Sequence, residues 1–439
     1  MVQDYAERMI ALHIYVAVPG DSVWSVARKF SLSPEAVVYA NQLASPAVLA
    51  VGQALLLPVY ALSYTVSPGQ TVSSVARSLQ VSEARLLAQN PQLTDPDRLS
   101  AGAVLNVTFA EPKRGPLRTN GYAYPNISDA SLEAAAPRMT YLSPFSCSLT
   151  AAGDLVPLAG DRRLIAAAYR AAAAPLLTLT NLNEGAGGFS SDILHTLLVN
   201  QRVQDNFLAQ LFRELDDKSY YGVNVDFEYV YPYDKASYEQ FLRRLADALR
   251  RRGYTVCAAL APKVSADQQG ILYSSHDYRV IGAIMDFVIL MTYEWGYTYG
   301  PPEAVSPLNS MRRVLAYAVT EIPREKLWMS LPNYGYDWTL PYVRGTAARA
   351  LTNTAAVTLA GRTGAAIAYD ERKATPYFRY LDDAGRRHEV WFDDARSIKA
   401  KLSLAAEYGL AGVSWWTLNP LYRTNFLLLE AMYDVQKVL

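Results

Sequence analysis

The stretch YGVNVDFE, residues 221–228, decides the fold of the chain around it. Apolar and polar residues alternate along this stretch, which is typical of a β-strand whose successive side chains point to opposite faces. The apolar face holds Val223, Val225 and Phe227, and the polar face holds Asn224, Asp226 and Glu228. Residues 229–234 have the composition of a loop, so the carboxyl groups come at the strand's C-terminal end. An α/β barrel places its catalytic residues at this end of its strands.

The alternative is a strand whose polar face lies in water, which is the common situation for carboxylates. Two observations weaken this alternative. The other face of the strand is fully apolar, and helix-like segments flank it on both sides. A parallel strand between helices is covered on both faces. Carboxylates buried in this way are costly unless they are paired, hydrogen-bonded or protonated, which predicts a functional site.

Strand-like and helix-like segments alternate over the rest of the chain, in the order typical of a parallel sheet. The predicted strands are residues 119–124, 139–146, 175–182, 222–228, 255–261, 287–293, 327–331 and 412–417. Helices fit between most of them, for example residues 235–252 and 311–319, and a last helix is expected over residues 425–436. Eight such units over about 320 residues predict an α/β fold of the (β/α)8 TIM-barrel type. A turn-rich segment after the seventh strand, about residues 338–390, predicts a small α+β insertion.

The first hundred residues contain an internal repeat. Tyr15 aligns with Tyr64, an offset of 64 − 15 = 49 residues, and the offset becomes 102 − 52 = 50 at Gly52 and Gly102. The same alignment pairs Pro19-Gly20 with Pro68-Gly69, residues 25–28 with 74–77, Ser33 with Ser82, and Asn41 with Asn90. A period of this size indicates tandem modules.

Each repeat predicts a small βααβ unit. A strand ends in a Pro-Gly turn, Ser22 or Thr71 caps a first helix, and Ser33 or Ser82 caps a second helix before a closing strand. We therefore expect a first module at residues 13–59, a second at 62–108, a Pro/Gly linker at 109–117 and the barrel at 118–439. A βααβ module that serves protein contacts is the alternative reading.

The shared motif Y-x-[AV]-x-P-G-[DQ]-[ST]-V resembles the lysin motif (LysM), a module that binds glycans containing N-acetylglucosamine. The resemblance implies that the loop after the first strand and the loop before the second hold the sugar. These loops are residues 20–23 with 44–47, and residues 69–72 with 93–96.

Charge and composition narrow the classes of binding partner that the sequence predicts. The 41 basic and 41 acidic groups give no net charge, which argues against nucleic-acid or anionic-membrane partners. The 31 tyrosines and seven tryptophans suit sugar stacking as well as an aromatic core. Cys147 and Cys257 lie in apolar runs and are expected to be buried, and the four scattered histidines suggest no metal or cofactor. No membrane span is expected, the acidic and basic residues Asp4, Glu7 and Arg8 argue against a standard signal peptide, and a monomer is expected.

The strand 221–228 resembles the D-G-x-D/N-x-D-x-E strand of the family-eighteen glycoside hydrolases, the chitinase family, although Tyr221 replaces the usual first Asp. Met291-Thr292-Tyr293-Glu294, residues 331–338 and residues 412–416 resemble further strand ends of that family. The resemblance implies that Glu228 is the general acid, that Asp226 orients the substrate's acetamido group, that Tyr293 binds its carbonyl oxygen and that Asn224 positions Asp226. The implied substrate-binding residues are Tyr122, Met291, Glu294, Asn333, Tyr334, Trp338 and Trp416. Each of the aromatic residues, taken alone, would more often pack in the core or rim.

The combination of two lysin motifs with this barrel resembles spore cortex-lytic enzymes and related spore germination hydrolases. It implies a retaining β-N-acetylglucosaminidase that cleaves peptidoglycan with the help of the substrate's own acetamido group. Such a protein would be associated with the spore cortex or coat, or with the cell wall. A chitinase acting on exogenous chitin is the second reading. An inactive glycan-binding or coat protein is the third, and the retained Glu228 argues against it.

Overall fold

The computed structural model describes residues 12–44, 48–93, 95–183 and 187–439. The N-terminal segment with Asp4, Glu7 and Arg8 lies outside the described residues. The same holds for residues 45–47 and Thr94, which belong to two of the loops expected to hold sugar.

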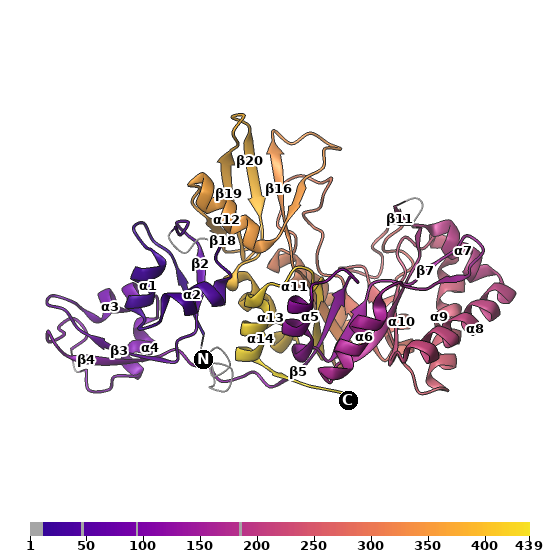
Figure 1. Cartoon of the computed structure of the whole chain (residues 1–439), viewed down its shortest axis with the longest axis horizontal. Coiled ribbons are helices and arrows are strands. Elements are labelled where there is room, and N and C mark those ends of the chain that lie inside the picture. The colour runs from indigo at the N-terminus through magenta and orange to yellow at the C-terminus, as the bar shows by residue number, and fades with distance from the viewer. Residues whose placement is uncertain (1–11, 45–47, 94, 184–186) are drawn as a thin grey trace.

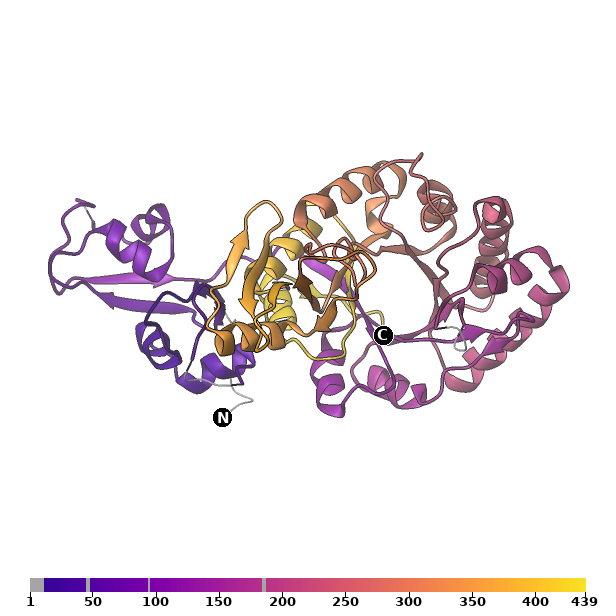
Figure 2. The ribbon, with the colours of Figure 1, turned by 90° about the horizontal axis from the view of Figure 1, so that it is seen from above.

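Eight parallel strands form a closed barrel, as the sequence predicts (Figure 2). They are β5 (Pro116–Ala123), β6 (Tyr141–Pro144), β9 (Ala174–Thr180), β12 (Gly222–Asp226), β13 (Thr255–Leu260), β14 (Phe287–Leu290), β15 (Leu327–Pro332) and β21 (Gly412–Trp416). Each strand pairs with the next, and β21 pairs with β5 to close the ring. The apolar residues of β12 and the adjoining Phe227 are fully buried, and Phe227 packs against Tyr238 and Phe241.

Helices surround the barrel (Figure 2). They are α5 (Asp129–Ala135), α6 (Asp161–Arg170), α7 (Ser191–Val199), α8 (Gln201–Lys218), α9 (Lys235–Arg250), α10 (Tyr278–Ile284), α11 (Leu308–Glu321), α13 (Ala395–Tyr408) and α14 (Arg423–Met432), with 3-10 turns at Ala136–Arg138, Pro232–Asp234 and Arg324–Lys326. Two small hairpins decorate the ring: β7 (Ser148–Leu149) with β8 (Leu155–Val156), and β10 (Leu182–Asn183) with β11 (Gly188–Phe189).

Several boundaries differ from the sequence expectation. Strand β12 ends at Asp226, two residues earlier than expected, and Tyr229 beyond it has a φ of 55°. The last helix stops at Met432, and β22 (Asp434–Val435) follows where helix was expected. This short strand pairs with the first residues of β5, Pro116 and Leu117, which the sequence places in the linker.

The segment after β15 forms the expected α+β insertion, which stands above the barrel in Figure 1. It contains β16 (Gly335–Leu340), β17 (Arg349–Leu351), α12 (Asn353–Thr363), β18 (Ala368–Asp370), β19 (Thr375–Leu381) and β20 (Arg387–Trp391). The strands form an antiparallel sheet in the order β17-β16-β20-β19-β18. Helix α12 covers the sheet, with Ala356 and Ala360 in one buried cluster with Phe378 and Val390.

The N-terminal region has the predicted double βααβ pattern. The first module contains β1 (His13–Val16), α1 (Val23–Lys29), α2 (Pro34–Asn41) and β2 (Ala54–Leu57), and the second contains β3 (Ala61–Thr65), α3 (Val72–Leu79), α4 (Glu83–Ala88) and β4 (Val104–Thr108). The capping predictions are confirmed at all four helices, since Ser22, Ser33, Thr71 and Ser82 each accept a hydrogen bond from a backbone N–H of the first turn. Buried apolar side chains of both modules form one common cluster, which joins the modules to each other.

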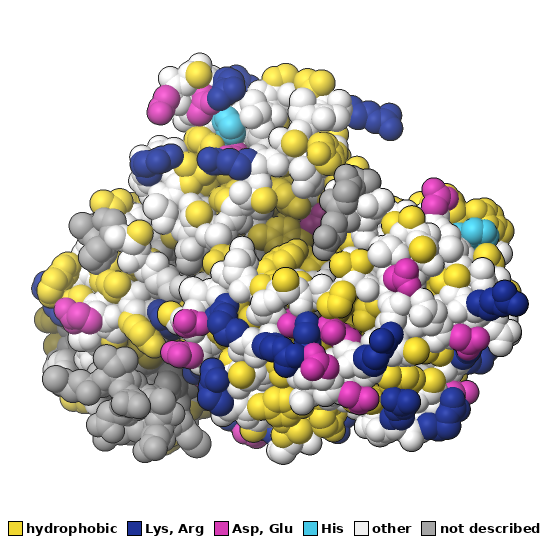
Figure 3. All heavy atoms as spheres, turned by 45° about the vertical axis from the view of Figure 1, so that its right-hand side comes forward, with side chains coloured by type: hydrophobic (Ala, Val, Ile, Leu, Met, Phe, Trp, Pro, Cys, Tyr) yellow, Lys and Arg dark blue, Asp and Glu magenta, His cyan; other side chains and the backbone are white. Residues whose placement is uncertain are grey.

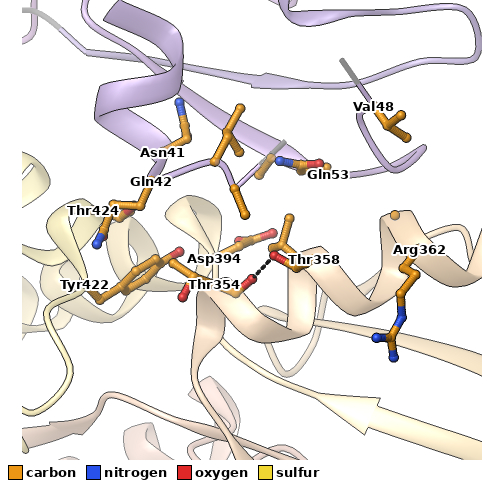
Figure 4. A pocket seen from close by; sticks show the side chains of 15 residues that line it. Asn41, Gln42, Val48, Gln53, Thr354, Thr358, Arg362, Asp394, Tyr422 and Thr424 are labelled. Carbon is orange, nitrogen blue, oxygen red and sulfur yellow. Dashed lines mark hydrogen bonds between the residues drawn. The ribbon is translucent and has the colours of Figure 1, made fainter. Parts of the chain in front are cut away.

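The first module also packs against the barrel, on the side of α13 and α14 (Figure 1). Gln42 exchanges two hydrogen bonds with this side, donating to the carbonyl oxygen of Leu421 and accepting from the N–H of Arg423. The Arg423 guanidinium lies 3.9 Å from the centre of the Tyr39 ring. Between this module, α12 and α14 lies a cavity of about 320 Å³, with Gln42, Thr358 and Asp394 among its lining residues (Figure 4).

A further sequence prediction is met at the two cysteines. Cys147 and Cys257 are buried and free. Among the described helices, none combines the length and apolar character that crossing a membrane requires.

Candidate active site

The predicted site residues gather at the C-terminal ends of the barrel strands. Tyr122, Asp226 and Trp416 lie at the ends of β5, β12 and β21, while Tyr293 and Tyr334 lie just beyond β14 and β15. Figure 3 shows the surface hollowed between the insertion and the barrel, with hydrophobic side chains in the hollow. The five strands thus bring together residues that are up to about 300 positions apart in the chain.

Asp226 is a buried carboxyl group with an unmet hydrogen-bonding capacity. The residue is 4% exposed, and its Oδ1 accepts no hydrogen bond from any described group. Burial raises the pKa of Asp226 to about 7, because the charged form loses its hydration. A buried acceptor without a partner is costly, so this oxygen is set up to receive a donor from a ligand.

Glu228 lies two residues farther along, half-buried at the rim. Burial raises the pKa of its carboxyl group well above the ordinary range, and the charges of Asp226 and Glu294 raise it further. Two carboxylates that face each other cannot both ionise cheaply, so one proton stays on the pair near neutral pH. A protonated carboxyl group at the rim is the chemical requirement for a general acid.

Asn224, which the family resemblance implies positions Asp226, is hydrogen-bonded to the end of β5. Its amide nitrogen donates a 2.7 Å hydrogen bond to the hydroxyl of Tyr122. The Asn224 Oδ1 is buried and has no partner among the described groups, like Oδ1 of Asp226. The inner face of β12 therefore presents two unmatched acceptors, and Tyr122, which is 2% exposed, packs beneath them instead of lining an open surface.

Tyr293 and Glu294 follow β14 after Met291, which is half-buried. Burial raises the pKa of Tyr293 well above its ordinary value, and the nearby Tyr122, Asp226 and Glu228 add to the effect, so its hydroxyl stays protonated and can donate. Glu294 has a φ of 66° and accepts hydrogen bonds from the hydroxyls of Tyr334 and Tyr336. Desolvation raises the pKa of Glu294.

Trp416, the residue expected to form an aromatic floor, is held by neighbouring rings. Its ring is half-buried and meets three other rings edge to face: Tyr122 at 5.3 Å, Phe145 at 4.6 Å and Tyr124 at 6.0 Å between centroids. Edge-to-face contacts of this kind fix a ring's orientation. The partly open indole is thus held in place as a stacking surface. Phe145 and Tyr124, which support it, were not predicted from the sequence.

Two of the predicted binding residues have other environments than expected. Trp338 is 1% exposed, and its indole N–H donates to the carbonyl oxygen of Gly300, so its ring belongs to the buried core of the insertion. Asn333 is also buried, and its amide donates to the carbonyl oxygens of Thr417 and Pro420. It therefore fixes the chain that follows Trp416 and does not face the hollow.

Sequence reasoning missed two buried polar residues beside Glu228. Asn181 bonds to both backbone groups of Glu228, and the His276 ring bonds to the carbonyl oxygen of Phe227. Asn181 follows the apolar strand β9 directly, so the pattern that singled out Asn224 could have found it. His276 lies in a loop, where no sequence pattern marks it. The described residues contain no cluster of three histidine, cysteine or acidic side chains that could hold a metal ion.

Comparison with known proteins agrees with this architecture. Residues 185–420 match glycosyl hydrolases family 18, and residues 15–58 and 64–108 match the LysM domain. The chain is 38% identical over 436 residues to the cortical fragment-lytic enzyme of Bacillus subtilis (strain 168), which covers 97% of this chain and 99% of that one.

Solved structures extend the comparison. The spore cortex-lytic enzyme SleL of Bacillus megaterium QM B1551 has a TM-score of 0.83 and 35% identity, covering 98% of this chain and all of the other. A chitinase from Chromobacterium violaceum has a TM-score of 0.65 and 27% identity, over 72% of this chain and 98% of the other. With a family match over more than half its length and a relative of this identity along its whole length, the chain belongs to the family 18 glycoside hydrolases and carries two LysM domains.

Proposed function

We propose that this chain is a retaining β-N-acetylglucosaminidase that cleaves the peptidoglycan of the bacterial spore cortex. The observation that supports it most is the pairing of Asp226 and Glu228, one with an unmatched buried oxygen and the other with a strongly raised pKa. A 2-acetamido sugar supplies what both groups need, an amide N–H for the first and a glycosidic oxygen for the second.

In the first half of the reaction, the Glu228 carboxyl group gives its proton to the glycosidic oxygen as the bond from that oxygen to C1 breaks. The acetamido carbonyl oxygen attacks C1 from the opposite face and forms a cyclic oxazolinium ion. Asp226 accepts the acetamido N–H and balances the developing positive charge, and Tyr293 donates its hydroxyl to the acetamide oxygen. The sugar ring stacks on the indole ring of Trp416.

In the second half, the Glu228 carboxylate removes a proton from water. The hydroxide equivalent opens the oxazolinium ring at C1, restoring the acetamido group and the protonated acid. Two inversions at C1 give a product with the β configuration. Both steps use groups that the buried, low-dielectric end of the barrel holds in place, which is where electrostatic stabilisation acts most strongly.

The substrate class is inferred from the relatives. The Bacillus relatives are described as a cortical fragment-lytic enzyme and a spore cortex-lytic enzyme, and each aligns over at least 97% of this chain. We assign this chain a place in the spore cortex or coat on the same ground. Its two LysM domains would hold peptidoglycan and raise the local concentration of glycan at the barrel.

Digestion of purified cortex peptidoglycan, with mass spectrometry of the released fragments, tests the proposal. We expect new reducing ends at N-acetylglucosamine, on fragments that carry muramic lactam. Reducing ends at the muramic residue would contradict the assigned bond. Crystalline chitin is the parallel substrate, because the barrel also resembles a chitinase. Efficient chitin cleavage with intact cortex would favour the chitinase reading, and no cleavage of either would favour an inactive glycan-binding protein.

A further inference from the structure

Glu228 is not part of a β-strand, although it follows one closely. Strand β12 pairs with β9 on one edge as far as Asp226 and Thr180, and with β13 on the other edge as far as Val225 and Ala258. Beyond these pairs the backbone ladder stops, two residues before the proposed acid. A free strand end would let the Glu228 side chain move relative to the substrate.

The side chain of Asn181 continues the ladder on the β9 edge. Its Oδ1 accepts the N–H of Glu228 at 3.0 Å, and its Nδ2 donates to the carbonyl oxygen of Glu228 at 2.8 Å. The amide group thus matches both backbone groups of Glu228, as a neighbouring strand would. Asn181 is itself fully buried, and it is anchored by hydrogen bonds to the backbone of Ser190, the N-cap residue of α7.

On the β13 edge, the ring of His276 takes the place of the missing backbone pairing. Its Nδ1 accepts the N–H of Ala261, the residue directly after β13, at 3.0 Å. The proton therefore sits on Nε2, which donates to the carbonyl oxygen of Phe227 at 3.1 Å. The residue is 1% exposed, and burial lowers its pKa to about 4, so the ring is neutral and keeps this tautomer over the working pH range.

We propose that Asn181 and His276 are positioning residues for the general acid, replacing the missing strand ladder on both sides of residues 227 and 228. The inference rests on the proposed function, because it assigns their purpose through Glu228. Neither side chain faces the hollow or needs to touch substrate. Their effect is to hold the Glu228 carboxyl group against Asp226 and Glu294 and away from water.

The chain contains a matched control for Asn181. In the second LysM module, Asn90 is also fully buried, and its Oδ1 accepts the N–H of Asn106 at 2.8 Å while its Nδ2 donates to the carbonyl oxygen of Asn106 at 2.8 Å. A third bond reaches the carbonyl oxygen of Leu86. Asn90→Ala therefore removes the same three kinds of hydrogen bond as Asn181→Ala, together with a 3.2 Å bond that its Oδ1 accepts from the side chain of Gln92, far from the acid.

The test compares Asn181→Ala with Asn90→Ala in the full-length protein, on a soluble 2-acetamido oligosaccharide. For Asn181→Ala we expect kcat to fall about 10- to 100-fold, since a small misplacement of a reacting group has an effect of this size. KM should stay within about threefold. Asn90→Ala should lower the unfolding temperature to a similar degree and leave kcat unchanged. Equal kcat losses in both variants, or an Asn181→Ala kcat within about threefold of the wild type, would overturn the proposal.

A second readout does not depend on turnover. The carboxyl 13C shift of Glu228, assigned by comparison with Glu228→Gln, reports its titration among the groups near it: Asp226, Glu294, Tyr122, Tyr229 and Tyr293. Release of the loop in Asn181→Ala admits water, so the midpoint should move to lower pH, and the basic limb of the kcat profile should move with it. An unmoved midpoint would contradict the positioning role. If the wild type cleaved no cortex fragment, the proposed function would fail, and this titration would still decide the role of Asn181.

Should Asn181→Ala fold too poorly to assay, Asn181→Asp provides the same comparison. It conserves size and the acceptor for the Glu228 N–H, but it turns a carboxylate oxygen toward the carbonyl oxygens of Glu228 and Ser190. A kcat loss with unchanged KM is expected here too, and wild-type kcat would contradict the proposal.

Discussion

The backbone N–H of Ile367, in the insertion, donates a 2.8 Å hydrogen bond to the carbonyl oxygen of Val51, in the first LysM module. The next residue, Gly52, accepts a hydrogen bond from Arg396 at the start of α13. The first LysM module is therefore held by contacts with both the barrel and its insertion, and not by its chain connection alone. The contact leaves no room for a side chain, because a Cβ atom on Gly52 would lie 1.9 Å from the carbonyl oxygen of Ile367.

Replacing Gly52 by alanine tests how much this contact stabilises the protein. Gly102 occupies the same place in the second module with the same φ of 82°, but a Cβ there would meet nothing within 4 Å. Both substitutions carry the same backbone strain, so their difference isolates the contact. We expect Gly52→Ala to lose about 1–3 kcal/mol more than Gly102→Ala in urea unfolding, the usual cost of overpacking. Equal losses would show that the module is not held by this contact.

The two tryptophans Trp416 and Trp338 should separate binding from stability. Trp416→Ala removes the half-open floor of the site, so we expect weaker binding of soluble 2-acetamido oligosaccharides and only a modest change in unfolding. Trp338→Ala leaves a cavity in the insertion core and should cost about 3–5 kcal/mol of stability. Calorimetric titration and thermal unfolding of both variants provide the check. Normal stability together with impaired binding in the Trp338→Ala protein would show that this residue belongs to the binding surface and not to the core.

The pKa of Asp226 predicts a pH dependence of stability. Folding raises this pKa from an ordinary 3.8 to about 7, so the folded protein binds the extra proton more tightly than the unfolded chain. The associated stability is fully present below about pH 4 and is lost as pH rises through about 7. Asp226→Asn abolishes the ionisation, so it should stabilise the protein at pH 8 by at least about 1 kcal/mol relative to its effect at pH 5. An effect that is the same at both pH values would contradict the burial argument.

Tyr293→Phe should slow cleavage without abolishing it. The substitution removes one hydroxyl and keeps the ring, so the expected loss in kcat/KM corresponds to about 1–3 kcal/mol, the value of one hydrogen bond in a desolvated site. Steady-state kinetics on a soluble oligosaccharide measures it. A thiazoline that mimics the cyclised acetamide should also bind the variant less tightly than the wild type. Unchanged binding of this compound would remove Tyr293 from the acetamide contact.

Much of the architecture could be predicted because its causes are local. Alternation in residues 222–226, the Pro-Gly turns and the capping serines each specify a strand, a turn or a helix start within a few residues. The positions of Asp226, Glu228 and Tyr293 follow from the same patterns, because the C-terminal ends of all the parallel strands lie at one end of a barrel.

The features that were missed depend on contacts between distant parts of the chain. Trp338 is buried because β20 and the loop carrying Gly300 close over it, and its sequence neighbours do not reveal this. Asn181 and His276 reach Glu228 and Phe227 from 47 and 49 residues away. The end of the last helix at Met432 likewise depends on the pairing of residues 434–435 with the start of β5.

We propose Glu228 as the general acid of a substrate-assisted mechanism. Glu228→Gln keeps the size of the side chain but has no proton to give, and the need for that proton depends on the leaving group. The decisive measurement is therefore the turnover of Glu228→Gln, relative to the wild type, on two substrates: cortex oligosaccharides, whose leaving group is a sugar, and a dinitrophenyl 2-acetamido glycoside, whose leaving group needs no protonation.

We predict that turnover of the cortex oligosaccharides falls by about 10²-fold or more while turnover of the dinitrophenyl glycoside falls far less. Near-normal turnover of the oligosaccharides by a well-folded Glu228→Gln protein, or equal losses on both substrates, would contradict the role of Glu228 as general acid.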